Sequence, residues 1–286
     1  MNYILHLIVI GTIFLGLAFS LKLLVVEGGI HSFAHAVFYG VGAYSYAIVS
    51  TKVGVPALAA LLISVLIAAP VCVALGAILA RLRKDDMVLG SIALQICFSS
   101  VLLNFTAITR GPFGIPGIPS MVSIDGNPVL PYAIGLTVLA VVCGLVGKTL
   151  PGKYLGLALR SARDSDRLAR SLGLRVESLR LAAIAAAAIP SLLFGAAYAS
   201  YAGYVDPSAF SLQESILVYA IVLVSGLRPG GAIFGVMIFV MLPEALRFVG
   251  STHGYSDQLR GAFLGLVLLA MPFLEGVMKQ RSARLP

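Results

Sequence analysis

The sequence predicts an all-α integral membrane protein, a polytopic bundle of about 8–10 transmembrane helices. Of its 286 residues, 59% are hydrophobic and only 11% are charged, whereas soluble domains carry about 25% charged residues. In lipid, every backbone polar group must be satisfied within the protein, which leaves helices or closed barrels. The apolar stretches here are long and continuous instead of alternating, so helices are expected.

Nine stretches approach the roughly 20 predominantly apolar residues that a spanning helix needs. They cover residues 3–26, 30–50, 56–80, 87–108, 129–147, 180–204, 212–226, 230–249 and 259–275. The 212–226 stretch is short and 30–50 is rich in Gly, Ser and Tyr, so either could be tilted, broken or re-entrant. We expect one transmembrane domain over residues 1–286.

Positive charge lies mainly in alternate loops between these stretches. With the nine spans as drawn, one set of loops holds 16 of the 20 Lys and Arg residues, and the other set holds four. Cytoplasmic loops are enriched in Lys and Arg, so the first set is predicted to be cytoplasmic, with the N-terminus outside and the C-terminus inside. The net charge of +8 is therefore assigned to membrane orientation and not to nucleic-acid binding.

Two segments rich in Gly and Pro interrupt the apolar pattern. Residues 109–128 cannot form a spanning helix and are predicted to form an external loop. Residues 226–235 divide one hydrophobic run into two, which predicts a tight cytoplasmic turn around Arg228, Pro229 and Gly230.

The cytoplasmic loop at about 148–180 carries the most informative pattern. Within residues 153–174, four arginines recur at intervals of three and four residues: Arg160, Arg163, Arg167 and Arg170. This spacing places them on one stripe of a helix. Asp164 lies four residues after the first of them and Asp166 four before the last, so acid–base pairs can support the same helix.

Small residues lie between these charges. Ala162 and Ala169 offer a surface that another backbone can approach, and Gly173 supplies a natural helix stop. A basic amphipathic helix of this kind can rest on anionic headgroups or dock into a groove of a partner protein. Composition does not choose between the two.

Five stretches follow one another along most of the chain in an order typical of a known family. They are SFAHAVFYGVGAY at 32–44, GPFGIPGIP at 111–119, the 153–174 loop, DPSAFSLQESI at 206–216 and SGLRPGGAIFG at 225–235. Together they resemble the permeases of bacterial ABC importers, specifically the branched-chain amino acid family. In the loop, the residues that match the coupling motif are Gly156, Arg160, Ala162, Arg163, Ala169 and Gly173. In the first stretch, the matches include Ser32, His35, Gly40, Gly42 and Tyr44.

The resemblance implies a subunit that moves branched-chain or related amino acids across the bacterial inner membrane. It also implies partners: a second permease subunit in a heterodimer, two ATP-binding subunits on the cytoplasmic loop, and a periplasmic solute-binding protein. Closure of the ATPases would move the 153–174 helix and switch the spans between outward-facing and inward-facing arrangements. Urea or short amides are the alternative substrates of the same permease type.

Polar residues inside the predicted spans are few. Gln95, Ser99, Ser100 and Asn104 form a group in the fourth span, where they can hydrogen-bond neighbouring helices or line the substrate path. His35 is expected to make a structural hydrogen bond in helix packing, next to glycines that allow close helix approach.

The sequence does not predict an enzyme. The triplet at 147–149, Gly-Lys-Thr, lacks the glycine five positions earlier that a phosphate-binding loop requires, so ATP hydrolysis is expected on a separate chain. His31 and His35 are four residues apart but no HExxH motif accompanies them, and neither a metal nor a cofactor is expected. The alternative is an ion-coupled secondary carrier, although such carriers usually place carboxylates at mid-membrane.

Overall fold

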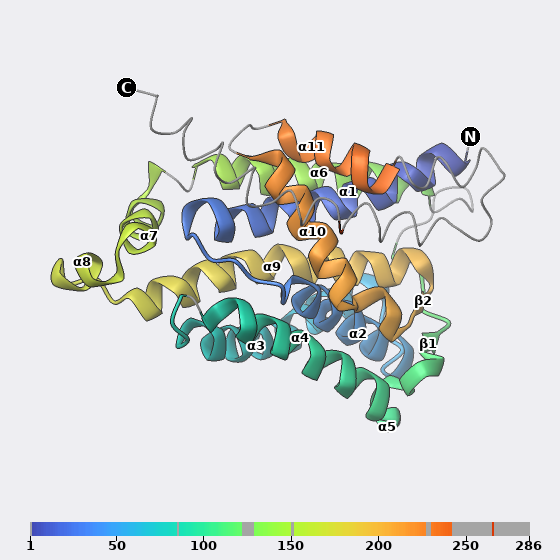
Figure 1. Ribbon diagram of the computed structural model, residues 1–286. Helices are drawn as coiled ribbons and strands as arrows, with labels where there is room; N and C mark the ends of the chain where they lie inside the picture. Colours follow the sequence, from blue (N-terminus) through green and yellow to red (C-terminus); the bar gives the residue numbers. More distant parts are fainter. Residues whose placement is uncertain are drawn as a thin grey trace.

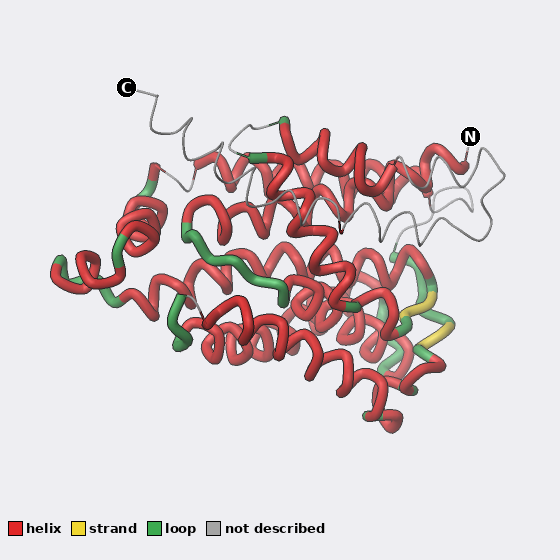
Figure 2. The backbone as a smooth tube through the Cα atoms, viewed as in Figure 1, coloured by secondary structure: helices red, strands yellow, loops and turns green. Residues whose placement is uncertain are grey.

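The computed structural model describes residues 2–84, 86–121, 129–149, 152–226 and 230–241, together with Gly265. These residues are almost entirely helical (Figures 1 and 2). In chain order the elements are α1 Asn2–Lys22, the π-helical η1 Leu23–Glu27, α2 His35–Lys52, α3 Ala57–Ala80, α4 Asp86–Asn104, α5 Thr106–Thr109, the 3-10 turn η2 Gly111–Phe113, β1 Ile115–Pro116, α6 Val129–Thr149, α7 Tyr154–Asp164, α8 Asp166–Ser171, α9 Val176–Ala202, β2 Tyr204–Val205, the 3-10 turn η4 Pro207–Phe210, α10 Leu212–Ser225, α11 Gly231–Val236 and the π-helical η5 Met237–Met241.

The predicted class, an all-α polytopic membrane protein, is confirmed. Within the described residues, five helices are long and apolar enough to cross a membrane: Tyr3–Glu27, α3, α4, α6 and α9. Two shorter apolar helices follow, α10 and the continuous segment Gly231–Met241. Leucines at 58, 62 and 66 of α3 are exposed at helical spacing, as a lipid-facing stripe requires. The predicted span 259–275 and the end of 230–249 lie outside the described residues.

Of the predicted spans, the 30–50 stretch differs most in the structure from a single spanning helix. Residues 28–34 run into the bundle without helical structure, and α2 begins only at His35 (Figure 2). Gly29, with φ of +58°, provides the change of direction that ends the preceding π-helical turn. The stretch 30–50 is thus broken, one of the alternatives that its composition left open: residues 30–34 are non-helical and α2 covers the rest.

The centre of the bundle is the contact between α2 and α9. A Cβ on Gly42 would lie 2.3 Å from the carbonyl oxygen of Leu192, and one on Gly195 would lie 2.0 Å from that of Tyr39. Such backbone approach is possible only where a helix presents glycine. The expected close approach at the 32–44 motif is confirmed, with α9 as the neighbour.

Short irregular elements close the end of the bundle opposite α7 and α8 (Figure 1). The two strands pair antiparallel, Ile115 with Val205 and Pro116 with Tyr204. Gly114 precedes them at φ of +62°, where a Cβ would lie 2.4 Å from the carbonyl oxygen of Val205. The 109–121 part of the predicted loop is thus ordered by pairing with the chain after α9, whereas residues 122–128 and the predicted turn at 227–229 lie outside the described residues.

Candidate functional site

The predicted coupling segment is two helices and not one. Ser165 has extended backbone angles, φ of −159° and ψ of 115°, and separates α7 from α8. Its hydroxyl oxygen accepts a hydrogen bond from the backbone N–H of Leu168 at 3.3 Å and so caps α8. The single arginine stripe predicted over 153–174 is therefore wrong: Arg160 and Arg163 belong to α7, whereas Arg167 and Arg170 belong to α8.

Helix α7 is attached to the π-helical end of the first span. Arg160 Nε lies 2.6 Å from Glu27 Oε2, and this carboxylate raises the pKa of the arginine by hydrogen bonding and charge attraction. Arg163 Nη1 donates to the carbonyl oxygen of Val26 at 2.5 Å. The stem of Arg163 also passes so close to Gly29 that a Cβ there would lie 2.6 Å from Arg163 Cγ. Both arginines of α7 thus bind their own chain.

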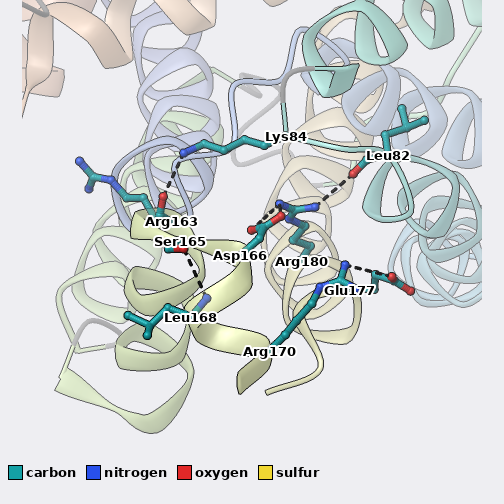
Figure 3. A network of polar contacts seen from close by, with 9 residues as sticks. All are labelled: Leu82, Lys84, Arg163, Ser165, Asp166, Leu168, Arg170, Glu177 and Arg180. Atoms are coloured by element: carbon teal, nitrogen blue, oxygen red, sulfur yellow. Dashed lines mark hydrogen bonds and ion pairs between the residues drawn. The ribbon is translucent and has the colours of Figure 1, made fainter. Parts of the chain in front are cut away.

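Helix α8 is attached to α9 and to the turn between α3 and α4 (Figure 3). Arg180 Nη2 donates to both carboxylate oxygens of Asp166, at 2.9 and 2.7 Å, and its Nη1 donates to the carbonyl oxygen of Leu82 at 3.1 Å. From the same turn, Lys84 Nζ donates to the carbonyl oxygen of Arg163 at 3.0 Å. One buried guanidinium therefore joins three segments that are far apart in sequence.

These partners correct the predicted pairs within one helix. Asp166 pairs with Arg180, fourteen positions away in the chain, while Arg170 reaches Glu177 at 3.5 Å. For Asp164, the described residues contain no ion pair. Arg180 was missed as a functional residue, since in the sequence it is only the last charged residue before a long apolar run.

Small residues of the segment pack inward. Ala162, Ala169 and Val176 form a small buried cluster, and Gly156 is buried in α7. The prediction that the alanines present a surface to another backbone is wrong, because α7, α8 and α9 cover them. Gly173 does end α8 as expected: its φ is +80°, and the N–H of Leu174 bonds the carbonyl oxygen of Ala169 at 3.1 Å.

The exposed side of the segment combines large apolar and basic side chains. Four large side chains that contribute to it are exposed: Tyr154, Leu157, Leu168 and Leu172. Arg167 and Arg170 are exposed beside them on α8. Exposed leucines and arginines together can bind a partner that presents apolar and acidic side chains.

The 32–44 motif forms part of the bundle core. His35 Nε2 lies 2.7 Å from Ser20 Oγ and 2.9 Å from Ser191 Oγ, so it joins α1, α2 and α9, as a packing role predicts. Ser32 Oγ accepts from the N–H of Ala34 at 3.3 Å. Tyr44 packs edge-on against Phe210, and Gly40 faces the rings of Phe98 and Phe210.

The polar group of the fourth span does not come together. Gln95 is fully buried; its Nε2 donates to the carbonyl oxygen of Phe210 at 2.7 Å and its Oε1 accepts from Ser215 at 3.2 Å. Ser100 and Asn104 are exposed on the outside of α4, where Asn104 Nδ2 donates to the carbonyl oxygen of Ser100. Ser99 is half-buried. A role of these residues in the substrate path stays a prediction.

No group of three or more His, Cys, Asp or Glu side chains in the described part of the chain is arranged to hold a metal ion. The two histidines considered for this role have other contacts. His31 Nδ1 lies 2.7 Å from the hydroxyl of Tyr219, and His35 binds the two serines.

Three of the segments predicted to be cytoplasmic, all within the described residues, meet at one end of the bundle. The α1 end, through Glu27, and the α3–α4 turn, through Leu82 and Lys84, both contact the α7–α8 segment. The fold therefore places these three segments together, as the shared side predicted from loop charge expects.

Comparison with known proteins identifies the family. Residues 3–272 match the family described as the permease component of the branched-chain amino acid transport system. A similar protein is the high-affinity branched-chain amino acid transport system permease protein LivM of Escherichia coli K12, with 26% identity over 91% of this chain and 67% of the relative. LivM of Salmonella typhimurium is 27% identical over the same shares. No solved structure matches the chain.

Proposed function

The chain belongs to the family of permease components of branched-chain amino acid transport systems, and from this premise we propose that it is the membrane-spanning subunit of an ATP-driven importer. Its relatives are named as permease proteins of a high-affinity branched-chain amino acid system. Branched-chain or related amino acids are accordingly the proposed substrates. ATP hydrolysis takes place on a separate partner chain.

The observation that carries this proposal is the attachment of the α7–α8 segment. Its inner side is held at η1, at the α3–α4 turn and at α9 by short polar contacts. Its outer side presents exposed leucines and arginines. A partner that pushes on the outer side therefore displaces three spanning elements together, which is what coupling to an external motor requires.

The other subunits follow from the same arrangement. Two ATP-binding subunits would occupy the cytoplasmic α7–α8 end of a permease heterodimer, and a periplasmic solute-binding protein would deliver substrate at the β1–β2 end. The concentration of Lys and Arg around α7 and α8 supports a cytoplasmic location for that end. In this orientation the N-terminus is periplasmic and the C-terminus is cytoplasmic, in a bacterial inner membrane.

The test disrupts the exposed apolar face without touching the inner contacts. Leu168, in α8, is 59% exposed, and Leu168→Glu should abolish co-purification of the ATPase and ATP-dependent leucine uptake. The matched control is Phe113→Glu, an exposed apolar-to-acidic change at the opposite end, which should keep the ATPase bound.

The outcomes separate the alternatives. If no ATPase co-purifies with the wild-type chain in mild detergent while uptake persists with an ion gradient, the protein is a secondary carrier and the proposal fails. If Leu168→Glu binds the ATPase as well as Phe113→Glu does, the docking face is wrong. Uptake of urea or short amides but not leucine would keep the importer and change its substrate.

A further inference from the structure

A cavity of about 290 Å³ lies where the ends of the first span and of α6 meet α7. Figure 1 shows α7 at the end of the bundle where α1 and α6 stop. The wall comes from the last turns of two helices that are long and apolar enough to cross a membrane, Tyr3–Glu27 and α6, and from one side chain of α7. Because both spans end here, the cavity lies at the depth of the lipid headgroups.

The lining changes from apolar to basic along the two spans. Its deeper part, one to two turns before the helix ends, contains Phe19, Cys143 and Gly144. Its outer part contains Lys148 of α6 and Arg160 of α7. A phospholipid has the same order, with its acyl chains in the bilayer and its charged phosphate at the surface. Basic pockets between membrane-spanning helices are typical binding sites of anionic lipid headgroups.

Arg160 has donors that the fold does not use. Its Nε binds Glu27 Oε2 at 2.6 Å, and its side chain is 50% exposed. Its two terminal nitrogens have no hydrogen-bond partner among the described residues. A guanidinium presents five N–H donors in a planar fork that matches the oxygens of a phosphate. One edge of Arg160 can therefore hold Glu27 while the terminal nitrogens bind an anion.

Lys148 adds a second cation. It lies in the last turn of α6, is exposed, and has no hydrogen bond or ion pair within the described residues. Lys22 also lines the cavity, but it donates to Ser225 Oγ at 3.1 Å and is left to that contact. The one carboxylate of the described lining belongs to Glu27, which Arg160 already binds. Lys148 is thus a positive charge in excess, and the cavity favours an anion.

An apolar track leads from Lys148 into the bilayer. Leu145 and Val141 lie three and seven positions before it, on the same face of α6, and are 55% and 52% exposed. A Cβ on the adjacent Gly147 would meet no heavy atom within 4 Å, so the helix surface is open there. A soluble phosphate would make no use of this track, whereas an acyl chain would pack along it.

We propose that this cavity binds the phosphate group of an anionic phospholipid. Arg160 and Lys148 hold the phosphate, and an acyl chain lies along Leu145 and Val141. The lipid then shares a guanidinium with Glu27 and holds α7 against the ends of two spans. Contact with anionic headgroups was one of the two roles that the sequence left open for the arginines of this segment. The site requires only that the protein spans a membrane, so it does not depend on the proposed import function.

The test is photolabelling of the purified full-length protein in mixed micelles. The probe is phosphatidylglycerol with a diazirine in one acyl chain, and we expect labelled peptides from residues 19–27 and 141–149. Phosphatidylcholine with the same photoreactive chain, whose headgroup has no net charge, should label these peptides severalfold less. Unlabelled phosphatidylglycerol should compete with the probe. Glycerol 3-phosphate, which has the phosphate without the acyl chains, should not.

Variants make the assignment specific. Lys148→Gln should lower labelling about fivefold, the contribution of one basic residue next to anionic lipid. Its matched control is Lys52→Gln, at an exposed lysine outside the lining, which should label as strongly as the wild type. Gly147→Leu should fill the open surface and block labelling. Its control is Gly135→Leu, which also enters open space on α6 but away from the cavity, and it should label normally.

Labelling confined to other helices overturns the site, and so does either cavity variant that labels as strongly as its matched control. Equal labelling by the phosphatidylcholine probe would overturn the recognition of an anionic headgroup. If glycerol 3-phosphate displaces the probe as well as phosphatidylglycerol does, the cavity is a site for soluble phosphates and the lipid proposal falls. ATP-dependent uptake is measured separately, so failure of the lipid site and failure of the import function are distinguishable.

Discussion

Removal of the Asp166 carboxylate should weaken the junction between α8 and the bundle. Its partner Arg180 has a side chain that is only 7% exposed, whereas Asp166 is 34% exposed. Breaking a fully buried pair costs about 3–5 kcal/mol, and an exposed pair contributes about 0.2–1 kcal/mol. Because water reaches Asp166, we expect Asp166→Ala to lower the free energy of unfolding by about 1–3 kcal/mol. The remaining contact of the guanidinium is the carbonyl oxygen of Leu82.

The matched control is the neighbouring pair of Arg170 and Glu177. Both side chains are more than half exposed and the atoms are 3.5 Å apart, so Arg170→Ala should cost at most about 0.5 kcal/mol. Unfolding in detergent would measure both changes. Combining Asp166→Ala with Arg180→Met should show a coupling energy above about 1 kcal/mol.

The functional assay for the same change is the ratio of leucine imported to ATP hydrolysed in proteoliposomes. With α8 released from α9, ATP hydrolysis should continue while import per ATP falls severalfold. The reasoning is refuted if Asp166→Ala and Arg170→Ala have equal effects on stability and on this ratio, or if the double variant is additive.

Two further changes probe the packing that surrounds this junction. Gly195→Ala should destabilise the bundle by about 1–3 kcal/mol, because its Cβ would meet the carbonyl oxygen of Tyr39 at 2.0 Å; Gly135→Ala, in open space on α6, is the control and should be neutral or stabilising in a melting experiment. Glu27→Gln should speed hydrogen exchange of the α7 amides, because the charge that holds Arg160 at 2.6 Å is removed, and unchanged exchange would contradict an anchoring role for that pair.

Hydropathy predicted the spans well where a helix faces lipid. For α3 and α6, the predicted ranges agree with the helices within two residues. These helices carry uninterrupted apolar runs because lipid contact demands them. Hydropathy left the 30–50 stretch open, because α2 lies among other helices, where Gly, Ser and Tyr side chains find partners. A buried helix has no need of uniform apolarity.

The coupling segment shows a different limit. Helical periodicity predicted the arginines on one stripe, and it could not predict that Ser165 would break the helix. Contacts with distant parts of the chain favour the break. Asp166 accepts a hydrogen bond from Arg180, and Arg163 donates one to the carbonyl oxygen of Val26. Local spacing contains no information on such partners, so both the break and the role of Arg180 required the tertiary structure.

The π-helical turn before residues 28–34 connects the α7–α8 segment with the buried start of α2. Glu27 in this turn is bound by Arg160 of α7. After residues 28–34 the chain enters α2 at His35, whose Nε2 contacts Ser20 of α1 and Ser191 of α9. A displacement of α7 therefore reaches His35 through a short non-helical segment of the backbone. Because that segment is non-helical, it can reorient without breaking a helical hydrogen-bond ladder, whereas a continuous helix over 30–50 would resist the same movement.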